Sequence, residues 1–182
     1  MMKNLKKKIA DVLGGEKRTY VLMIEIPAEE YLTGSMLSMD KLLGGDYQGI
    51  YVSFQRPEAN VREVLQSSGL DPSKVAIIDV ATLIGDSEGE VDIDVLVGAI
   101  YDALSRITSK NRFIFIDSLA TLALYRPLSE ILRFSEFLIH AVRETDSGKH
   151  RLIINVPRDL SRKRFIRDVA LKVDNVVTLG EA

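Results

Sequence analysis

Six short runs of apolar residues, each of β-strand length, constrain the fold of this chain more than any other feature. Within each run the apolar residues are nearly continuous instead of alternating with polar ones, which is typical of strands covered on both faces. The runs occupy residues 19–26, 49–54, 74–80, 112–117, 151–156 and 175–179. They therefore predict a buried sheet.

The segments between these runs carry the helical period. In 128–142 apolar residues recur every three or four positions, from Leu128 and Ile131 to Val142, and 94–107 repeats the pattern. Strands that alternate with helices predict an α/β fold, namely a doubly wound, mostly parallel sheet of about six strands with helices on both faces. With 182 residues, of which 46% are hydrophobic, the chain is long enough for one well-filled core, so we expect 1–182 to form a single domain.

Charge and composition exclude several classes of function. The net charge of -2 gives no global attraction to nucleic acid or to an anionic membrane. The absence of cysteine excludes disulfides and thiolate metal sites, and two histidines are too few for most catalytic zinc sites. No apolar stretch is long enough to span a bilayer, and the basic N-terminus lacks the apolar core of a signal peptide. We expect a soluble, cytoplasmic protein that binds no metal, with nucleic acid and membrane disfavoured as partners.

In a doubly wound sheet, ligands bind where strands end and helices begin. The fourth run ends in Asp117, directly followed by Ser118. A hydrophobic strand that ends in aspartate is the pattern of a Walker B strand, whose carboxylate holds magnesium beside the phosphates of a nucleotide. An acid at this position also commonly caps the following turn or helix. The strand by itself leaves both interpretations open.

The turn after the first run should carry the other half of a nucleotide site. A P-loop needs glycines whose backbone amides wrap the phosphates, a lysine that reaches the outer phosphates, and a Ser or Thr for magnesium. The chain contains no Gly-x4-Gly-Lys motif, and Glu29 and Glu30 stand where a polyanion would bind. Because these carboxylates would repel phosphate, ordinary nucleotide binding at this turn is not expected.

Four segments resemble the KaiC-like branch of the RecA superfamily. They are 9–26, with the family's short helix and Leu-Gly-Gly turn before the first strand, 49–71, with its second strand and helix, 112–122, with its Walker B strand, and 172–181, with its closing strand. The resemblance implies a RecA-type core in which strand 151–156 lies between strands 19–26 and 112–117. It also implies self-association, since these proteins assemble with nucleotide at subunit boundaries, and an archaeal source.

Placed on this chain without gaps, the family's phosphate loop is degenerate. Its glycines fall on Ile26 and Tyr31, its lysine on Leu32 and its Ser/Thr on Thr33, so only a hydroxyl is retained. The degenerate loop comprises Ile26, Pro27, Glu29, Glu30, Tyr31, Leu32 and Thr33.

The family's general base is lost as well. Its paired glutamates, one of which activates the attacking water, fall on Gln55 and Arg56, and glutamine takes up no proton as a carboxylate does. Asp117 and Ser118 are then a Walker B remnant, and a poor magnesium site because such sites rely on the nucleotide for several ligands. We therefore expect Asp117 to cap the turn that follows it, with Ser118 and Thr121 as local hydrogen-bond partners.

These losses predict a noncatalytic KaiC-like pseudo-ATPase, an interaction or regulatory protein with a protein partner, no cofactor and no enzymatic activity. The alternative is a weak nucleotide or small-molecule sensor that binds without hydrolysis. An enzyme of unrelated chemistry is disfavoured, because Gly34 and Ser35 lack the Gly-x-Ser-x-Gly frame of a nucleophile elbow.

Two charged segments need an interpretation of their own. A basic cluster is a candidate interface with a neighbouring subunit; it is also typical of a solvated helix face, and nucleic-acid contact is the least favoured interpretation. The cluster comprises Arg158, Arg162, Lys163, Arg164 and Arg167. The acidic segment 86–94 lacks EF-hand spacing, so it predicts a solvated loop with a helix N-cap at Asp92.

Bulky apolar residues follow the first strand in place of a phosphate loop. They are Tyr31, Leu32, Met36, Leu37 and Met39, and they predict either core packing of the following helix or a partner-binding face at the former nucleotide cleft. His140 and His150 are predicted to be surface residues, because neither has a second histidine three or four positions away.

Overall fold

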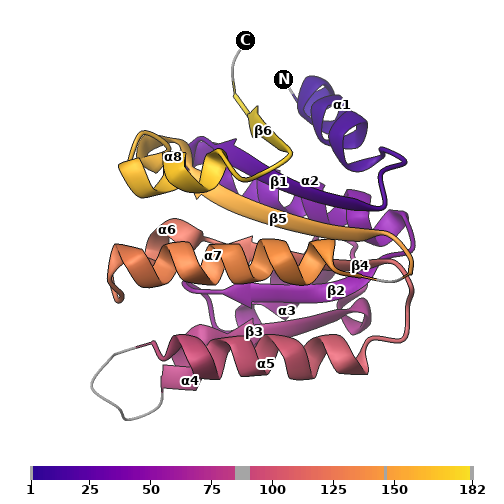
Figure 1. Ribbon diagram of the computed structural model, residues 1–182. Coiled ribbons are helices and arrows are strands. Elements are labelled where there is room, and N and C mark those ends of the chain that lie inside the picture. Colours follow the sequence, from indigo (N-terminus) through magenta and orange to yellow (C-terminus); the bar gives the residue numbers. More distant parts are fainter. Residues whose placement is uncertain (1, 85–90, 146, 181–182) are drawn as a thin grey trace.

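In the computed structural model, which describes residues 2–84, 91–145 and 147–180, six strands form a parallel sheet (Figure 1). Their order is β3-β2-β4-β5-β1-β6, and each adjacent pair is parallel. The strands are β1 (Thr19–Ile26), β2 (Gln48–Ser53), β3 (Val75–Asp79), β4 (Arg112–Asp117), β5 (His150–Pro157) and β6 (Asn175–Thr178). The predicted position of β5 between β1 and β4 is confirmed.

Helices cover both faces of the sheet, as the apolar runs predicted. Figure 1 shows α5, α7 and α8 on one side and α2 and α3 on the other. The α-helices are α1 (Met2–Leu13), α2 (Tyr31–Gly44), α3 (Glu58–Ser67), α4 (Val80–Ile84), α5 (Ile93–Arg106), α6 (Leu119–Leu122), α7 (Leu128–Arg143) and α8 (Arg164–Ala170). The described residues also form the short 3-10 helices η1 (Ala28–Glu30), η2 (Pro72–Lys74) and η3 (Arg158–Leu160).

Two apolar clusters fill the space between the sheet and its helical layers. One joins the sheet to α5, α7 and α8, and includes Ile116, Phe134 and Ile154. The other joins the opposite face to α1, α2 and α3, and includes Met39 and Phe115. Because β4 and β5 are central and covered on both faces, nearly every side chain in them is buried, which explains their continuous apolar sequence.

Helix ends follow local sequence where the chain supplies a cap. The side chain of Asp92 accepts hydrogen bonds from the backbone amides of Asp94 (2.8 Å) and Val95 (3.3 Å), so the predicted N-cap of α5 is confirmed. The rest of the predicted acidic loop, 86–90, lies outside the described residues. At the start of α7, Leu128 is exposed rather than on the buried stripe, because the helix meets the core only from Ile131 onward.

The parallel arrangement brings the carboxyl ends of the six strands to one edge of the sheet. In register, Ser53 of β2 pairs with Asp117 of β4, and Ile26 of β1 pairs with Pro157 of β5. The turn to α2, the loop to α3 and the short helix α6 all leave from this edge, which we call the carboxyl edge.

Candidate functional site

The carboxylate of Asp117 lies at the centre of the carboxyl edge and is only 2% exposed. The Tyr31 hydroxyl donates a hydrogen bond to Oδ1 of Asp117 at 2.7 Å, and the Tyr51 hydroxyl donates to Oδ2. Tyr31 is the first residue of α2 and Tyr51 lies in β2, so three elements converge on one side chain. Each carboxylate oxygen thus accepts from one phenol.

Burial next to a carboxylate keeps both phenols protonated. Desolvation is the largest cause that raises the pKa of Tyr31 well above its ordinary value, followed by the charge of Asp117 and the hydrogen bond to it. The same causes raise the pKa of Tyr51. The buried Oγ of Ser118 has no hydrogen-bond partner among the described residues. The two phenols are therefore fixed as donors.

The predicted capping role of Asp117 is wrong. Ser118 is the N-cap of α6, and no side-chain bond caps this helix. Asp117 accepts instead from two tyrosines distant in sequence, and Thr121 Oγ1 accepts from Nε2 of Gln55 at 2.6 Å. Local capping preference is outweighed here because a buried carboxylate gains more from two donors already held in place by the core.

The turn between β1 and α2 leaves few backbone donors for an anion. Ile26 ends β1, and Pro27 has no amide hydrogen. The amide of Glu30 donates to the carbonyl of Pro27 at 3.0 Å, and the amide of Tyr31 donates to that of Ala28. These bonds close η1, so this turn is wound into a helix rather than opened as a cradle. Glu29 and Glu30 occupy its first turn.

The bulky residues that follow have separate locations. Met36 and Met39 are buried in the core below α2, so for these two residues the core-packing interpretation is confirmed. Leu32 is 41% exposed, and Thr33 is exposed beside it. Gly34 allows α2 to approach the sheet, since a Cβ there would lie 3.1 Å from Ile26 Cγ2. Of this segment, Leu32 remains available for contact with another molecule.

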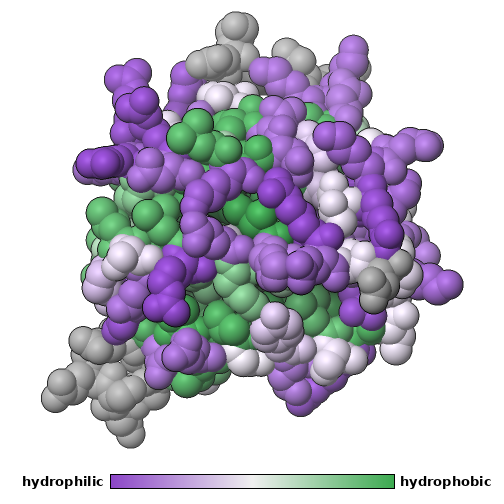
Figure 2. Space-filling view, in the orientation of Figure 1, coloured by the Kyte–Doolittle hydropathy of each residue, from purple (hydrophilic) through white to green (hydrophobic). Residues whose placement is uncertain are grey.

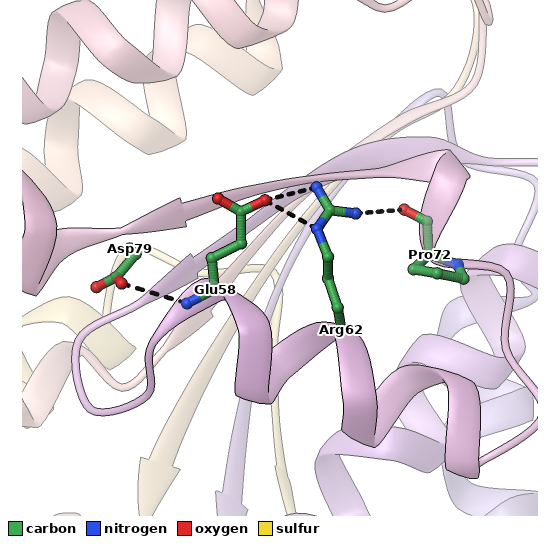
Figure 3. Close-up of polar contacts among 4 residues, drawn as sticks. All are labelled: Glu58, Arg62, Pro72 and Asp79. Carbon is green, nitrogen blue, oxygen red and sulfur yellow. Dashed lines mark hydrogen bonds and ion pairs between the residues drawn. The ribbon is translucent and has the colours of Figure 1, made fainter.

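The loop between β2 and α3, which carries Gln55 and Arg56, is held by its own hydrogen bonds. Ser53 Oγ donates to the carbonyl of Arg56 at 2.7 Å and lies 3.0 Å from its amide. Further along, the amide of Glu58 donates to Asp79 Oδ2 at 3.2 Å, which ties the start of α3 to the end of β3 (Figure 3). The loop is therefore fixed, with the neutral amide of Gln55 next to Arg56.

The exposed end of α3 carries an ion pair that also fixes its position. Arg62 Nε donates to Glu58 Oε1 at 2.8 Å, and its Nη1 lies 3.5 Å from the carbonyl of Pro72 in η2, as Figure 3 shows. Because both charged side chains are about half exposed, the pair contributes little to stability and serves mainly to orient the loop.

The roles of three polar residues of this site, namely Tyr51, Asn155 and Ser35, were not predicted from the sequence. Tyr51 is the second donor to Asp117. Asn155 Nδ2 donates to Ser35 Oγ at 2.9 Å, and Ser35 Oγ donates to the carbonyl of Tyr31 at 2.8 Å. The signal was present, since Tyr51 and Asn155 are polar groups in otherwise apolar strands, and such groups are usually paired when buried.

The candidate interface lies in η3, the following turn and α8, beyond the end of β5. Arg162, Lys163, Arg164 and Arg167 are polar residues of this surface, which Figure 2 shows in part as one of the hydrophilic areas around the apolar ones. The prediction that His150 is a surface residue is wrong: it is 8% exposed because β5 is central, and its Nε2 lies 3.0 Å from the carbonyl of Ser147.

One residue of the basic cluster and one of the two histidines remain to be located. Arg158, in η3, is half-buried, so it belongs to the candidate interface only in part. His140, in α7, is exposed, as predicted. The basic cluster is therefore a surface feature at its later positions.

Two further features of the described part of the chain bear on the type of site. No cluster of three or more His, Cys, Asp or Glu side chains suited to a metal ion occurs among the described residues. Over the same residues, no helix combines the length and apolar character that a membrane span requires.

Comparison with known proteins addresses the fold. No protein-family model and no curated protein matches the sequence. Among solved structures, a KaiC-like protein of the hyperthermophilic archaeon Pyrococcus horikoshii is similar at a TM-score of 0.66 and 17% identity, covering 93% of this chain and 75% of that one. An uncharacterised protein of the same organism, solved in complex with an unknown peptide, gives 0.66 and 19% over 96% and 84%. The flagellar accessory protein FlaH of Methanocaldococcus jannaschii gives 0.65 and 14% over 94% and 76%.

The sheet order, the covered faces and these likenesses define an α/β domain with a RecA-like fold. The similar structures include a KaiC-like protein and an ATPase domain, which agrees with the predicted fold class. At these identities the likeness concerns the fold.

Proposed function

We propose that this chain is a noncatalytic RecA-type domain, a KaiC-like pseudo-ATPase that acts by binding a protein partner. The observation that carries the proposal is the state of Asp117, whose two oxygens accept hydrogen bonds from Tyr31 and Tyr51 in a buried setting. A magnesium ion or its water shell would have to displace both phenols. The residue aligned with the P-loop lysine is Leu32, which offers no charged contact with a phosphate to offset that cost.

Two other features support the same conclusion. The amides of Glu30 and Tyr31 are used within η1, while the carboxylates of Glu29 and Glu30 oppose a polyanion. Gln55 is a hydrogen-bond donor to Thr121 and has no basic group to activate water. Phosphate binding, metal binding and base catalysis are thus each disfavoured by a different residue.

A protein-binding role is supported by exposed apolar side chains near the carboxyl edge. In the connection from α6 to α7, Leu124 is 78% exposed and Tyr125 is also exposed, as is Leu128 at the start of α7. Clustered exposed apolar residues mark contact surfaces more often than isolated ones do. Leu32 adds an exposed apolar side chain at the start of α2.

Calorimetric titration with ATP and magnesium tests the loss of nucleotide binding. We expect no saturable heat with the wild-type chain or with Tyr31→Phe, which frees one oxygen of Asp117, and Tyr101→Phe serves as a matched exposed control. Micromolar binding by the wild type would overturn the dead-site proposal. Saturable binding without phosphate release would favour the sensor alternative instead.

Affinity purification from the source cells tests the protein-binding role. A partner retained by the wild type and by the control Leu171→Glu, but lost with Leu124→Glu, is the expected result, since both leucines are exposed and only Leu124 lies in the connection from α6 to α7. Equal retention by both variants would contradict a contact at the α6–α7 connection. Light scattering on the same samples distinguishes a second copy of the chain from a different partner.

A further inference from the structure

At the opposite edge of the sheet, a buried cation has no anionic partner among the described residues. Arg151, the second residue of β5, is 1% exposed. Its Nη2 donates to the carbonyl of Gly15 at 2.9 Å, and its Nη1 donates to the carbonyls of His150 (3.0 Å) and Arg18 (3.3 Å). Its Nε is buried without a hydrogen-bond partner in the same part of the chain. This positive charge is therefore solvated by neutral carbonyls and is not balanced by an anion among the described residues.

This arrangement is unusual because buried charges are normally paired with an opposite charge. No ion pair involves Arg151 in the part of the chain that the structure describes. Its Cζ lies 5.7 Å from the centre of the Tyr47 ring, which is a favourable cation–π contact. Desolvation lowers the pKa of the Arg151 guanidinium, opposed by the phenols of Tyr47 and Tyr20. Arginine nonetheless stays protonated in proteins, so the unbalanced charge persists.

Arg151 lines a small cavity of about 240 Å3. The cavity lies between α1, the turn that follows it, β1 and β6, at the end of the sheet where Figure 1 shows α1 beside β6. Its other lining residues are Asp11, Val12, Gly15, Lys17, Tyr20 and Asn175. Lys17 adds a second cation, which lies 5.3 Å from the centre of the Tyr20 ring.

We propose that this cavity binds a small molecule carrying a single carboxylate and an apolar body, with the carboxylate against Arg151 and Lys17. A guanidinium presents paired donors that match a carboxylate, and the buried Nε supplies a donor that lacks an acceptor among the described residues. Val12 and the Tyr20 ring provide apolar contact for the remainder of the ligand.

The lining also argues for a monocarboxylate over a polyanion. Asp11 is exposed and lines the same cavity, so its charge opposes a doubly charged ligand more than a singly charged one. The cavity is smaller than pockets that hold drug-sized ligands, which limits the ligand to a few carbon atoms or one ring. This site is separate from Asp117 and does not depend on the proposed pseudo-ATPase role.

Thermal unfolding and calorimetry with butyrate, 3-phenylpropionate, butyramide and inorganic phosphate test the assignment. We expect both carboxylates to bind saturably and to raise Tm with the logarithm of their concentration, because a ligand that binds only the folded state stabilises it. The neutral butyramide should have no effect. Stronger stabilisation by phosphate than by butyrate, or equal effects of butyrate and butyramide, would overturn the carboxylate class.

Substitutions of two lining residues test whether the ligand binds in this cavity. Lys17→Gln should weaken butyrate binding about tenfold while leaving unfolding without ligand nearly unchanged, because Lys17 is exposed. Arg151→Lys keeps the charge but loses the planar donor pair, and it should abolish binding; if it fails to fold, Lys17→Gln still decides. Lys163→Gln, an exposed lysine on the turn before α8, is the matched control. Undiminished binding by Lys17→Gln, or equal loss in Lys163→Gln, would refute the site.

Discussion

The hydroxyl of Tyr31, at the first residue of α2, lies 2.7 Å from Oδ1 of Asp117, at the last residue of β4. The two residues are separated by 86 positions in the chain, yet they meet at the carboxyl end of a central strand, which is where doubly wound folds bind their ligands. The buried carboxylate of Asp117 is therefore satisfied by side chains of the protein itself.

Removing the Tyr31 hydroxyl should destabilise the fold. In Tyr31→Phe one oxygen of a buried carboxylate loses its donor, and such a loss costs about 1–3 kcal/mol. Urea denaturation of the variant measures the free energy of unfolding. Tyr101→Phe, at an exposed tyrosine of α5, is the control and should change stability by less than about 0.5 kcal/mol. Equal effects of the two substitutions would show that the Asp117 contact contributes nothing.

Stability should fall at alkaline pH through the same phenols. Folding raises the pKa of Tyr31 and of Tyr51 above the ordinary value of 10.0 that applies in the unfolded chain. Their contribution is fully present below about pH 10 and is lost as the pH rises towards the folded values, because the unfolded chain then releases protons that the folded chain retains. Urea midpoints measured from about pH 8 to about pH 11 should decline, and less steeply in Tyr31→Phe than in the wild type. Parallel slopes would contradict the raised pKa of Tyr31.

Burial of His150 should make the protein sensitive to mild acid. Desolvation is the main cause that lowers the pKa of His150 below 6.5, and the charges of Arg112, Arg18 and Arg151 add to it against the opposing Ser147 carbonyl. A depressed pKa gives stability that is present above pH 6.5 and lost as the pH falls, since the unfolded chain takes up the proton first.

Two histidine variants check this pH dependence. His150→Gln should flatten the fall in urea midpoint between about pH 7 and about pH 5, while the exposed His140→Gln should leave it as in the wild type. A flattened profile in His140→Gln, with no change in His150→Gln, would contradict the assignment of this pH dependence to His150.

Two glycines should respond to alanine with opposite signs. Gly148, in the turn before β5, has φ +82, and a Cβ there would lie 1.8 Å from the carbonyl oxygen of Lys110. Gly148→Ala should therefore cost more than about 2 kcal/mol. Gly98, inside α5, has no atom within 4 Å of an added Cβ, so Gly98→Ala should stabilise by roughly 0.5–1 kcal/mol through helix propensity. Thermal unfolding of both variants compares them directly, and a shared sign would contradict this account of the turn.

Much of the fold was predictable because its signals are local. The bounds of β1 and β4 match the predicted runs, and the other strand bounds differ by no more than one residue at each end. These strands are recognisable since their residues must be apolar on both faces. Asp92 was recognisable as an N-cap for a similar reason, because its acceptor and the amides that it satisfies lie within three residues.

The contacts of Asp117 and the burial of His150 were not predictable from local patterns. The sequence determined that an acid would end a buried strand, and its local preferences pointed to a cap. Only the packing of β2 and α2 against β4 decided that Tyr51 and Tyr31 would reach that acid first. The same holds for Arg151 and His150, whose surroundings depend on β5 being central in the sheet. The apolar pattern of a strand can be recognised from consecutive residues. The partner of a buried polar group, in contrast, comes from an element far away in the chain, and only tertiary packing brings the two together.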